Sequence, residues 1–408
     1  MKTRATEAEQ VLFTPRLVLF LASQNLSLFG SSVVGYAIIW YITLETSSGI
    51  WLMFATLTQM VPHVLISLYS GVWADRYSRK RLIMLSDGFI ALATFSLALA
   101  FFAGYQRLEL LLAVSVVRSI GSGIQSPAVN AIMPQLVSQQ HLTRVQGINQ
   151  SIGSILLLLS PAVGGLVLGT MDISWAFMLD VVTAGLAIVI FCFIKVEKLV
   201  RVEESTSMVK DIKEGLSYTF GNPILRNLII AYAFSFFLIT PAAILTPLLV
   251  ERTFGPEVWR LTTNEMVWTL GSLFGGIFVS MKGQFKDKIR AIALSLVAFG
   301  VLFALLGVAP SFTLYLIIMG IAGVFMPILA TAETVMIQEL TEPTKMGRVF
   351  SIVQILSASS MPLGILLFGP LSDVVSVESL LIISGVLLAL VGLLYQRTNK
   401  SSTEATRR

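Results

Sequence analysis

Long apolar runs separated by short polar links dominate this chain. Twelve runs are predicted, at about 16–43, 50–73, 82–103, 109–134, 145–169, 175–194, 224–249, 264–281, 290–309, 312–338, 347–371 and 376–395. About 20 helical residues cross a hydrocarbon core of about 30 Å. Alternating ten-residue strands are absent, so the runs are expected to be helices rather than strands of a barrel. The pattern predicts an all-α membrane protein with twelve transmembrane helices.

The composition agrees with membrane spans. The chain is 55% apolar and only 12% charged, against roughly 25% charged residues in soluble domains. Its first ten residues are polar and no small-residue cleavage site follows them, so we expect no cleaved signal peptide. It has no Walker-type glycine loop and no cluster with metal-ligand spacing, so we expect neither ATP nor a metal nor any other cofactor.

Lysine and arginine residues fall mainly on one side of the predicted membrane. With the N-terminus inside, 24 of the 28 lie in the tails and in links on that side, and three lie on the other side. This excess predicts that both termini are cytoplasmic. The net charge of +5 is thereby explained by topology, and we expect no nucleic-acid partner.

The two halves of the chain repeat each other. The motif Gly123-x-x-x-Pro127 recurs as Gly323-x-x-x-Pro327, an offset of 200. Three further pairs follow in the same order at offsets up to 205, namely Gly71 with Gly276, Arg144 with Arg348 and Pro161 with Pro362. The repeat predicts two pseudo-symmetric six-helix bundles, 1–194 and 224–408, joined by a cytoplasmic linker at 195–223. In that linker, 208–220 has the spacing of an amphipathic helix, which lies on the membrane or caps the bundle.

The link between the second and third spans has an unusual sequence, Gly71-Val-Trp-Ala-Asp-Arg-Tyr-Ser-Arg-Lys-Arg81. It resembles the loop between helices 2 and 3 of the major facilitator superfamily of transporters. The resemblance implies a conformational latch formed by Gly71, Asp75, Arg76, Arg79 and Lys80. In such a latch, Asp75 docks on the N-terminus of a facing helix while the cytoplasmic side is closed. Topology alone explains the four cations, but it explains neither Gly71 nor Asp75. Ser280 replaces the acid in the second half.

A few ionisable residues lie inside predicted spans, where they need a partner or a water-filled face. Arg118-Ser-Ile-Gly-Ser-Gly resembles the arginine motif of the superfamily's fourth span. That likeness implies a role of Arg118 in proton coupling, and a bond to backbone carbonyls is the alternative. Asp180 and Glu333 are the expected proton-relay acids. Asp87 is assigned to the charge network of the 71–81 link.

Small residues and proline mark the fifth span. Gly147, Pro161, Gly164 and Gly165 match the glycine-proline motif of the exporter branch of the superfamily, whereas Leu156 and Ser160 depart from it. The likeness implies a helix-packing motif that lets this span slide against the eighth, as in antiport and export. Ordinary glycine-rich packing is the alternative.

Polar and aromatic residues within two spans predict a substrate cavity. They are Gln24, Asn25, Tyr36 and Trp40 in the first span and Tyr232, Phe234, Phe236 and Phe237 in the seventh. Amides are disfavoured against lipid, and an apolar aromatic cavity with few polar groups suits amphipathic molecules.

Longer stretches are similar to the macrolide-efflux branch of bacterial drug exporters. They are Arg118–Gly121 with Pro127-Ala-x-Asn130-Ala, and 347–351 with Met361-Pro-Leu-Gly364. The resemblance implies a monomeric multidrug exporter in the bacterial inner (cytoplasmic) membrane. It would move macrolide-like amphipathic drugs by proton antiport and alternating access. An exporter of an endogenous siderophore or lipid is the alternative. A non-transporting receptor or sensor is a weaker one, and an enzyme is weaker still because no nucleophile–base constellation occurs.

Overall fold

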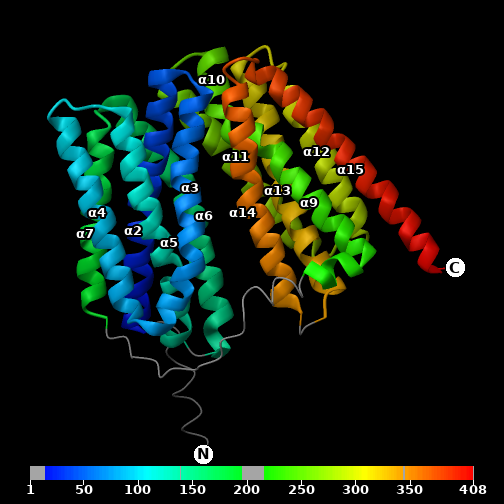
Figure 1. Ribbon diagram of the computed structural model, residues 1–408, viewed down its shortest axis with the longest axis horizontal. Helices are drawn as coiled ribbons and strands as arrows, with labels where there is room; N and C mark the ends of the chain where they lie inside the picture. Colours follow the sequence, from blue (N-terminus) through cyan, green and yellow to red (C-terminus); the bar gives the residue numbers. More distant parts are fainter. Residues whose placement is uncertain (1–13, 138, 195–215, 343–344, 408) are drawn as a thin grey trace, which may run out of the picture. The chain divides into compact units, whose positions relative to one another are not determined.

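Helices make up all the regular structure in the described part of the chain (Figure 1). The computed structural model describes residues 14–137, 139–194, 216–342 and 345–407. The helices are α2 (Pro15–Thr46), α3 (Gly49–Arg76), α4 (Arg79–Phe102), α5 (Leu108–Leu136), α6 (Gln139–Thr170), α7 (Ser174–Cys192), α9 (Pro223–Ile244), α10 (Thr246–Phe254), α11 (Val258–Lys282), α12 (Lys288–Leu306), α13 (Phe312–Leu340), α14 (Met346–Leu371) and α15 (Val377–Arg407). The all-helical fold predicted from the hydropathy pattern is confirmed. The predicted linker helix at 208–220 lies largely outside the described residues.

Eleven helical segments among the described residues are long and apolar enough to cross a membrane. One of them, Pro223–Phe254, comprises both α9 and α10. The seventh predicted span therefore consists of two helices, which meet at Leu245. Proline fits in the first turn of α10 because the first N–H groups of a helix have no partner within it. The remaining predicted span, α11, carries Asn264 and Glu265, which dilute its apolar sequence.

The chain divides into two compact units. The first comprises Met1–Ile42 and Leu57–Val202, and the second comprises Thr43–Thr56 and Glu203–Arg408. In the first unit, α4 packs along α5 and α7. In the second, α12 packs along α13 and α15, α9 along α14 and α15, and α11 along α13. The domain boundaries predicted at 194 and 224 flank residues outside the described ranges and stay a prediction.

The sequence repeat corresponds to a repeated helix contact. Gly123 of α5 faces the backbone carbonyl of His63 in α3, and a Cβ atom there would lie only 2.8 Å from that oxygen. Gly323 of α13 faces the carbonyl of Trp268 in α11, and its Cβ would lie 2.5 Å from that oxygen. The positions differ by 200 and by 205, the offsets of the repeat. Glycine thus allows the fourth helix of each bundle to approach the second closely.

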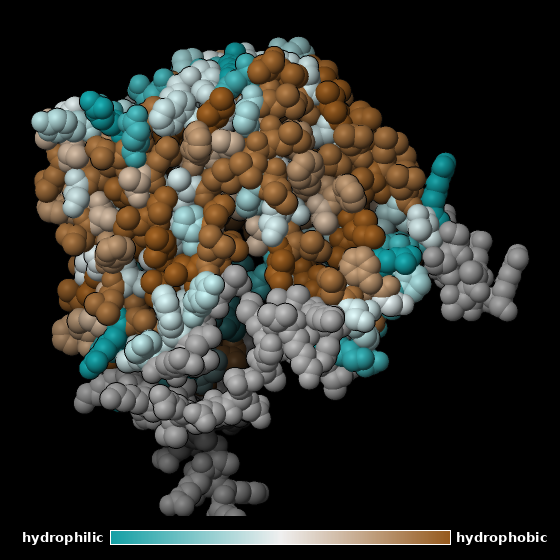
Figure 2. Space-filling model, viewed as in Figure 1, coloured by the Kyte–Doolittle hydropathy of each residue, from teal (hydrophilic) through white to brown (hydrophobic). Residues whose placement is uncertain are grey.

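Apolar side chains cover the outer faces of the helices. Figure 2 shows hydrophobic atoms in brown along the middle of the helices, with teal atoms gathered at helix ends. Large exposed residues of this kind include Leu85, Phe89 and Leu92 on α4 and Leu390, Leu393 and Leu394 on α15. Such a surface suits contact with lipid.

Candidate functional site

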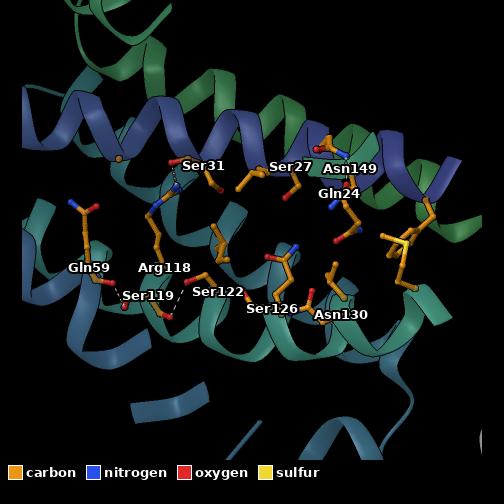
Figure 3. Close-up of a pocket in the computed structure, with 18 of the residues that line it drawn as sticks. Gln24, Ser27, Ser31, Gln59, Arg118, Ser119, Ser122, Ser126, Asn130 and Asn149 are labelled. Atoms are coloured by element: carbon orange, nitrogen blue, oxygen red, sulfur yellow. Dashed lines mark hydrogen bonds between the residues drawn. The ribbon is translucent and has the colours of Figure 1, made fainter. Parts of the chain in front are cut away.

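A polar cavity of about 370 Å³ lies inside the first unit. It is lined by residues of α2 to α6, and Figure 3 shows the side chains that converge on it. Seven amides line it, from Gln24, Asn25, Gln59, Gln125, Asn130, Gln146 and Asn149. Asn25 donates to the side-chain oxygen of Asn149 at 3.2 Å and so connects α2 with α6. The prediction that Gln24 and Asn25 line a cavity agrees with this geometry.

A buried ion pair lies beside this cavity, with Arg118 in its wall. Arg118 of α5 contacts the carboxylate of Asp180 on α7, and the two side chains are 10% and 0% exposed. The pair is surrounded by hydrogen-bonding groups, since Ser31 donates to Asp180 at 3.1 Å and Thr94 donates to it at 3.2 Å. The sequence predicted functional roles for Arg118 and for Asp180 separately, but it did not predict that they form an ion pair. Pairing neutralises two charges that would each be unfavourable alone in the membrane interior.

The backbone of α2 reaches this ion pair because of a glycine. A Cβ at Gly30 would clash with the hydroxyl of Thr183 and would lie 3.0 Å from the Cα of Asp180. Only a residue without a side chain lets α2 and α7 come this close. The close approach also brings Ser31 within hydrogen-bonding distance of the carboxylate.

Asp87 of α4 lies in the same unit and contacts polar side chains of α2 and α5. Its carboxylate is 3% exposed and accepts hydrogen bonds from Ser27 of α2 and Gln125 of α5, each at 2.8 Å. The side chains of Asp75 and Arg76 are not described, so the assignment of Asp87 to the charges of the 71–81 link stays a prediction. Asp87 is only two turns from that link along α4, and its side chain is buried in the bundle.

A second cavity, of about 420 Å³, lies inside the second unit. Its walls are mainly aromatic and aliphatic, with Tyr232 and Phe236 of α9, Trp268 of α11 and Phe299 and Phe303 of α12 among them. The rings of Tyr232 and Phe236 stack with centroids 4.5 Å apart. No lysine, arginine or histidine is among the described residues that line it.

Two glutamates line this apolar cavity. Glu333 of α13 is 6% exposed, and Glu265 comes from α11, which packs along α13. Glu333 was predicted as an acid within a span, but Glu265 was missed. The eighth span was predicted to begin at 264, which put Glu265 at the membrane boundary. The helix begins at Val258, so Glu265 lies two turns inside it.

Two of the aromatic residues predicted for a cavity, Tyr232 and Phe236, line the second one, whereas the others line neither. Tyr36 of α2 packs its ring 5.4 Å from that of Trp40, and Phe237 packs 5.4 Å from Phe368. Phe234 is 58% exposed.

The latch residues are described only in part. Nothing is described of the side chains of Gly71, Asp75 and Arg76, so the latch stays a prediction. Arg79 donates to the carbonyls of Ala74 at 3.0 Å and Ala131 at 2.7 Å. The ammonium of Lys80 donates to the carbonyls of Cys192 and Ile194, both at 2.7 Å. These cations bind carbonyls near the C-terminal ends of α3, α5 and α7, where carbonyls lack helical partners and carry partial negative charge.

The glycine-proline motif of α6 divides into buried and open positions. Pro161, Gly164 and Gly165 are buried, and a Cβ at Gly164 would lie 3.4 Å from the carbonyl oxygen of Val33 on α2. Gly147 has open space where a Cβ would be. The buried part therefore serves packing against α2, and sliding against α11 stays a prediction.

A further polar network lies at the loop after α14, within the second unit. The carboxylate of Asp373 accepts hydrogen bonds from the backbone N–H groups of Gly49 and Ile50, at 2.7 and 3.0 Å, and from Ser48 at 2.8 Å. Arg252 forms an ion pair with it at 2.9 Å. Partial burial tends to raise the pKa of Asp373, but these hydrogen bonds outweigh it and hold the pKa below its usual value. Asp373 thus caps the first turn of α3.

Comparison with known proteins places the chain in a family. Residues 13–407 match the family model described as transmembrane secretion effector. The chain belongs to this family, within the major facilitator superfamily. It is a multi-pass membrane transporter and not an enzyme. The match covers nearly the whole chain, so the resemblance noted for the 71–81 link extends over both halves.

Relatives agree with the branch indicated by the sequence. The chain is 28% identical to macrolide efflux protein A of Streptococcus pyogenes over 93% of its length and 95% of the relative's. It is 22% identical to a staphyloferrin A transporter of Staphylococcus aureus, over 93% and 96% of the two chains. Among solved structures, a bacterial homologue of the iron transporter ferroportin in an inward-facing state matches with a TM-score of 0.72 at 14% identity, over 93% of this chain and 98% of that one. The resemblance to the macrolide-efflux branch of the major facilitator superfamily is confirmed.

Proposed function

We propose that this transporter exports amphipathic small molecules, macrolide-like drugs among them, by proton antiport and alternating access. It would act as a monomer in a bacterial cytoplasmic membrane with both termini in the cytoplasm. The relatives named macrolide efflux proteins support the substrate class, and the distribution of Lys and Arg supports the orientation.

The observation that carries the proton-coupling part is the set of buried acids. Asp180 is held by Arg118, whereas Glu333 lines a cavity and has no hydrogen bond or ion pair to any described residue. An acid inside the membrane without a partner is a candidate for a proton relay. Two acids in such different surroundings fit a cycle in which one acid titrates and the other stays paired.

The test is a drug-accumulation panel in cells with and without the protein. We expect cells that make it to accumulate less of a macrolide, and a proton uncoupler to abolish the difference. Equal accumulation with and without the protein across the panel would contradict drug export. A difference that persists with the uncoupler would leave export standing and contradict proton coupling.

A siderophore exporter is the second candidate. It is favoured by the similarity to the staphyloferrin A transporter over nearly the whole of both chains. Export of a labelled siderophore from the same cells, with no change in drug accumulation, would support this candidate over the first.

The proposed latch has a test of its own. We expect Asp75→Asn to lower drug export severalfold while the amount of protein in the membrane stays near normal. The reason is that the amide cannot supply the charge that favours a helix N-terminus. Glu339→Gln is a matched control, because Glu339 pairs with Lys288 at 3.0 Å and its side chain is 59% exposed. Unchanged export by Asp75→Asn would exclude the latch.

A further inference from the structure

We propose that the cavity in the second unit is a binding site for a lipophilic organic cation, with Glu265 and Glu333 as its anionic groups. The site lies entirely within the C-terminal bundle. The proposal names a substrate class for the export function above and in that respect rests on it.

The first argument is the lack of any counter-charge for Glu333. Glu333 is only 6% exposed as a whole residue, yet within the described residues its carboxyl group has neither a hydrogen bond nor an ion pair. Leaving such a group without a partner is unfavourable, and native proteins do so mainly where a ligand completes the site. The partner of Glu265 is weak as well, an amide N–H of Asn264 at 3.5 Å.

A second unsatisfied group lies beside the two acids. Asn264 lines the cavity and is 1% exposed, and its side-chain oxygen has no hydrogen-bond partner among the described residues. This oxygen is an acceptor, as both carboxylates are when ionised. The polar groups of the cavity are therefore suited to bind a positively charged ligand or a hydrogen-bond donor.

The aromatic residues that line the rest of the cavity indicate which kind of cation it can bind. Small inorganic ions need several oxygen ligands in a compact shell, and no group of three or more metal-binding side chains occurs among the described residues. Aromatic faces, in contrast, attract bulky ammonium-type cations. The rings of Tyr232 and Phe236, and those of Trp268 and Phe299, whose centroids are 6.3 Å apart, supply such faces. A volume of about 420 Å³ is within the usual range for small-molecule sites.

The sequence also shows that the two acids, Glu265 and Glu333, have no acidic counterparts in the first half. The repeat offset of 200 places Met133 opposite Glu333, and the offset of 205 places Met60 opposite Glu265. Neither acid is therefore inherited from the shared fold. Both occur in the bundle whose cavity has aromatic walls.

The experiment is equilibrium binding to the purified full-length protein in detergent. The probe is tetraphenylphosphonium, whose charge does not change with pH, and triphenylphosphine oxide serves as a neutral comparison. We expect the cation to bind more tightly than the neutral probe. Glu333→Gln should weaken cation binding about tenfold, and Glu265→Gln with Glu333→Gln should weaken it further. Binding of the neutral probe should stay within about twofold, which also shows that the variants are folded.

Two controls and two outcomes decide the matter. Glu339→Gln, on the same helix but in an exposed ion pair, and Asp87→Asn, in the first unit, should leave cation binding unchanged. Wild-type cation affinity in the double variant would overturn the proposal, and so would equal binding of the charged and the neutral probe. If cation binding fails while uncoupler-sensitive export persists in cells, the site is refuted and the export function stands. If the cation binds as expected but no drug is exported, the export function fails and the site stands.

Discussion

The two cavities occupy equivalent positions of the sequence repeat and differ in almost every side chain. Residues of α5 that line the first cavity are matched 200 positions later by residues of α13 that line the second, Ser119 with Met319, Ser126 with Met326, Val129 with Leu329, Asn130 with Ala330 and Met133 with Glu333. On α6 and α14, Gln146 and Asn149 are matched 204 positions later by Phe350 and Val353. The shared fold therefore determines where a cavity forms, and the side chains determine what it can bind.

The first cavity has the more polar walls, whereas the second has the more unpaired charge. The first cavity has hydroxyl and amide walls, and its strongest charges neutralise each other, since Arg118 pairs with Asp180. The second cavity has apolar walls and two acids without a cation. A polar cavity with paired charges can hold water and position a ligand, whereas isolated acids in an apolar cavity respond strongly to a proton or a cation. We infer that the two bundles contribute different steps to transport.

Removing Arg118 is expected to have the largest effect on this comparison. Arg118→Met leaves Asp180 buried without its cation, and the loss of one partner of a buried pair costs about 3–5 kcal/mol. Thermal unfolding of the purified protein in detergent measures it. Asp180→Asn in the same background should restore much of the stability, because the amide needs no counter-charge.

An exposed pair in the second unit is the matched control for that variant. Lys288→Met breaks the contact with Glu339, whose side chains are 22% and 59% exposed, and should cost less than about 1 kcal/mol. If Arg118→Met is no more destabilising than Lys288→Met, the Arg118–Asp180 pair does not stabilise the first unit.

The repeated glycine contacts should respond alike in both units. We expect Gly123→Ala and Gly323→Ala each to lower the free energy of unfolding by about 1–3 kcal/mol, since a Cβ would press on the backbone of the neighbouring helix. Gly147→Ala and Gly276→Ala are the controls, one in each unit, because both positions have open space. These two should be neutral or slightly stabilising, as alanine favours a helix. A clear loss in only one of the two contact variants would show that the repeat does not extend to packing.

The sequence predicted the features that follow from the contact of helices with lipid. It did not predict which face of a helix points into its bundle. The spans, the repeat and the buried charges followed from hydropathy, offsets and the cost of charge in lipid. The pairing of Arg118 with Asp180 did not, because it depends on how α5 and α7 pack. Glu265 was missed through an error of six residues in one helix start, and the facing of α9 could not be derived from a helix that is apolar on all sides. These errors concern the rotation of helices about their own axes and the positions of helix ends, both of which depend on tertiary packing.

The smallest expected effect separates the acids of the second unit by their partners. Asp373 has four hydrogen-bonding partners, whereas Glu333 has none among the described residues. Asp373→Asn should therefore lower stability at pH 7 by about 0.3–1 kcal/mol, through the weaker interaction with the N-terminus of α3. Thermal unfolding of both proteins at a series of pH values measures the difference.

The sign of the pH dependence follows from the lowered pKa of Asp373. A carboxyl group whose pKa is lower in the folded state contributes stability above its ordinary pKa of about 4. That contribution disappears as the pH falls through the lowered value, because the folded protein then takes up the proton too. The stability difference between wild type and Asp373→Asn should thus be constant near neutral pH and shrink below about pH 4. Glu257→Gln, which affects an exposed carboxylate paired with Arg260 on the same turn, should differ little from wild type at any pH. A difference that grows as the pH falls from 7 to 4 would contradict the capping role of Asp373. It would also remove the contrast between a fully partnered acid and Glu333 in the same bundle.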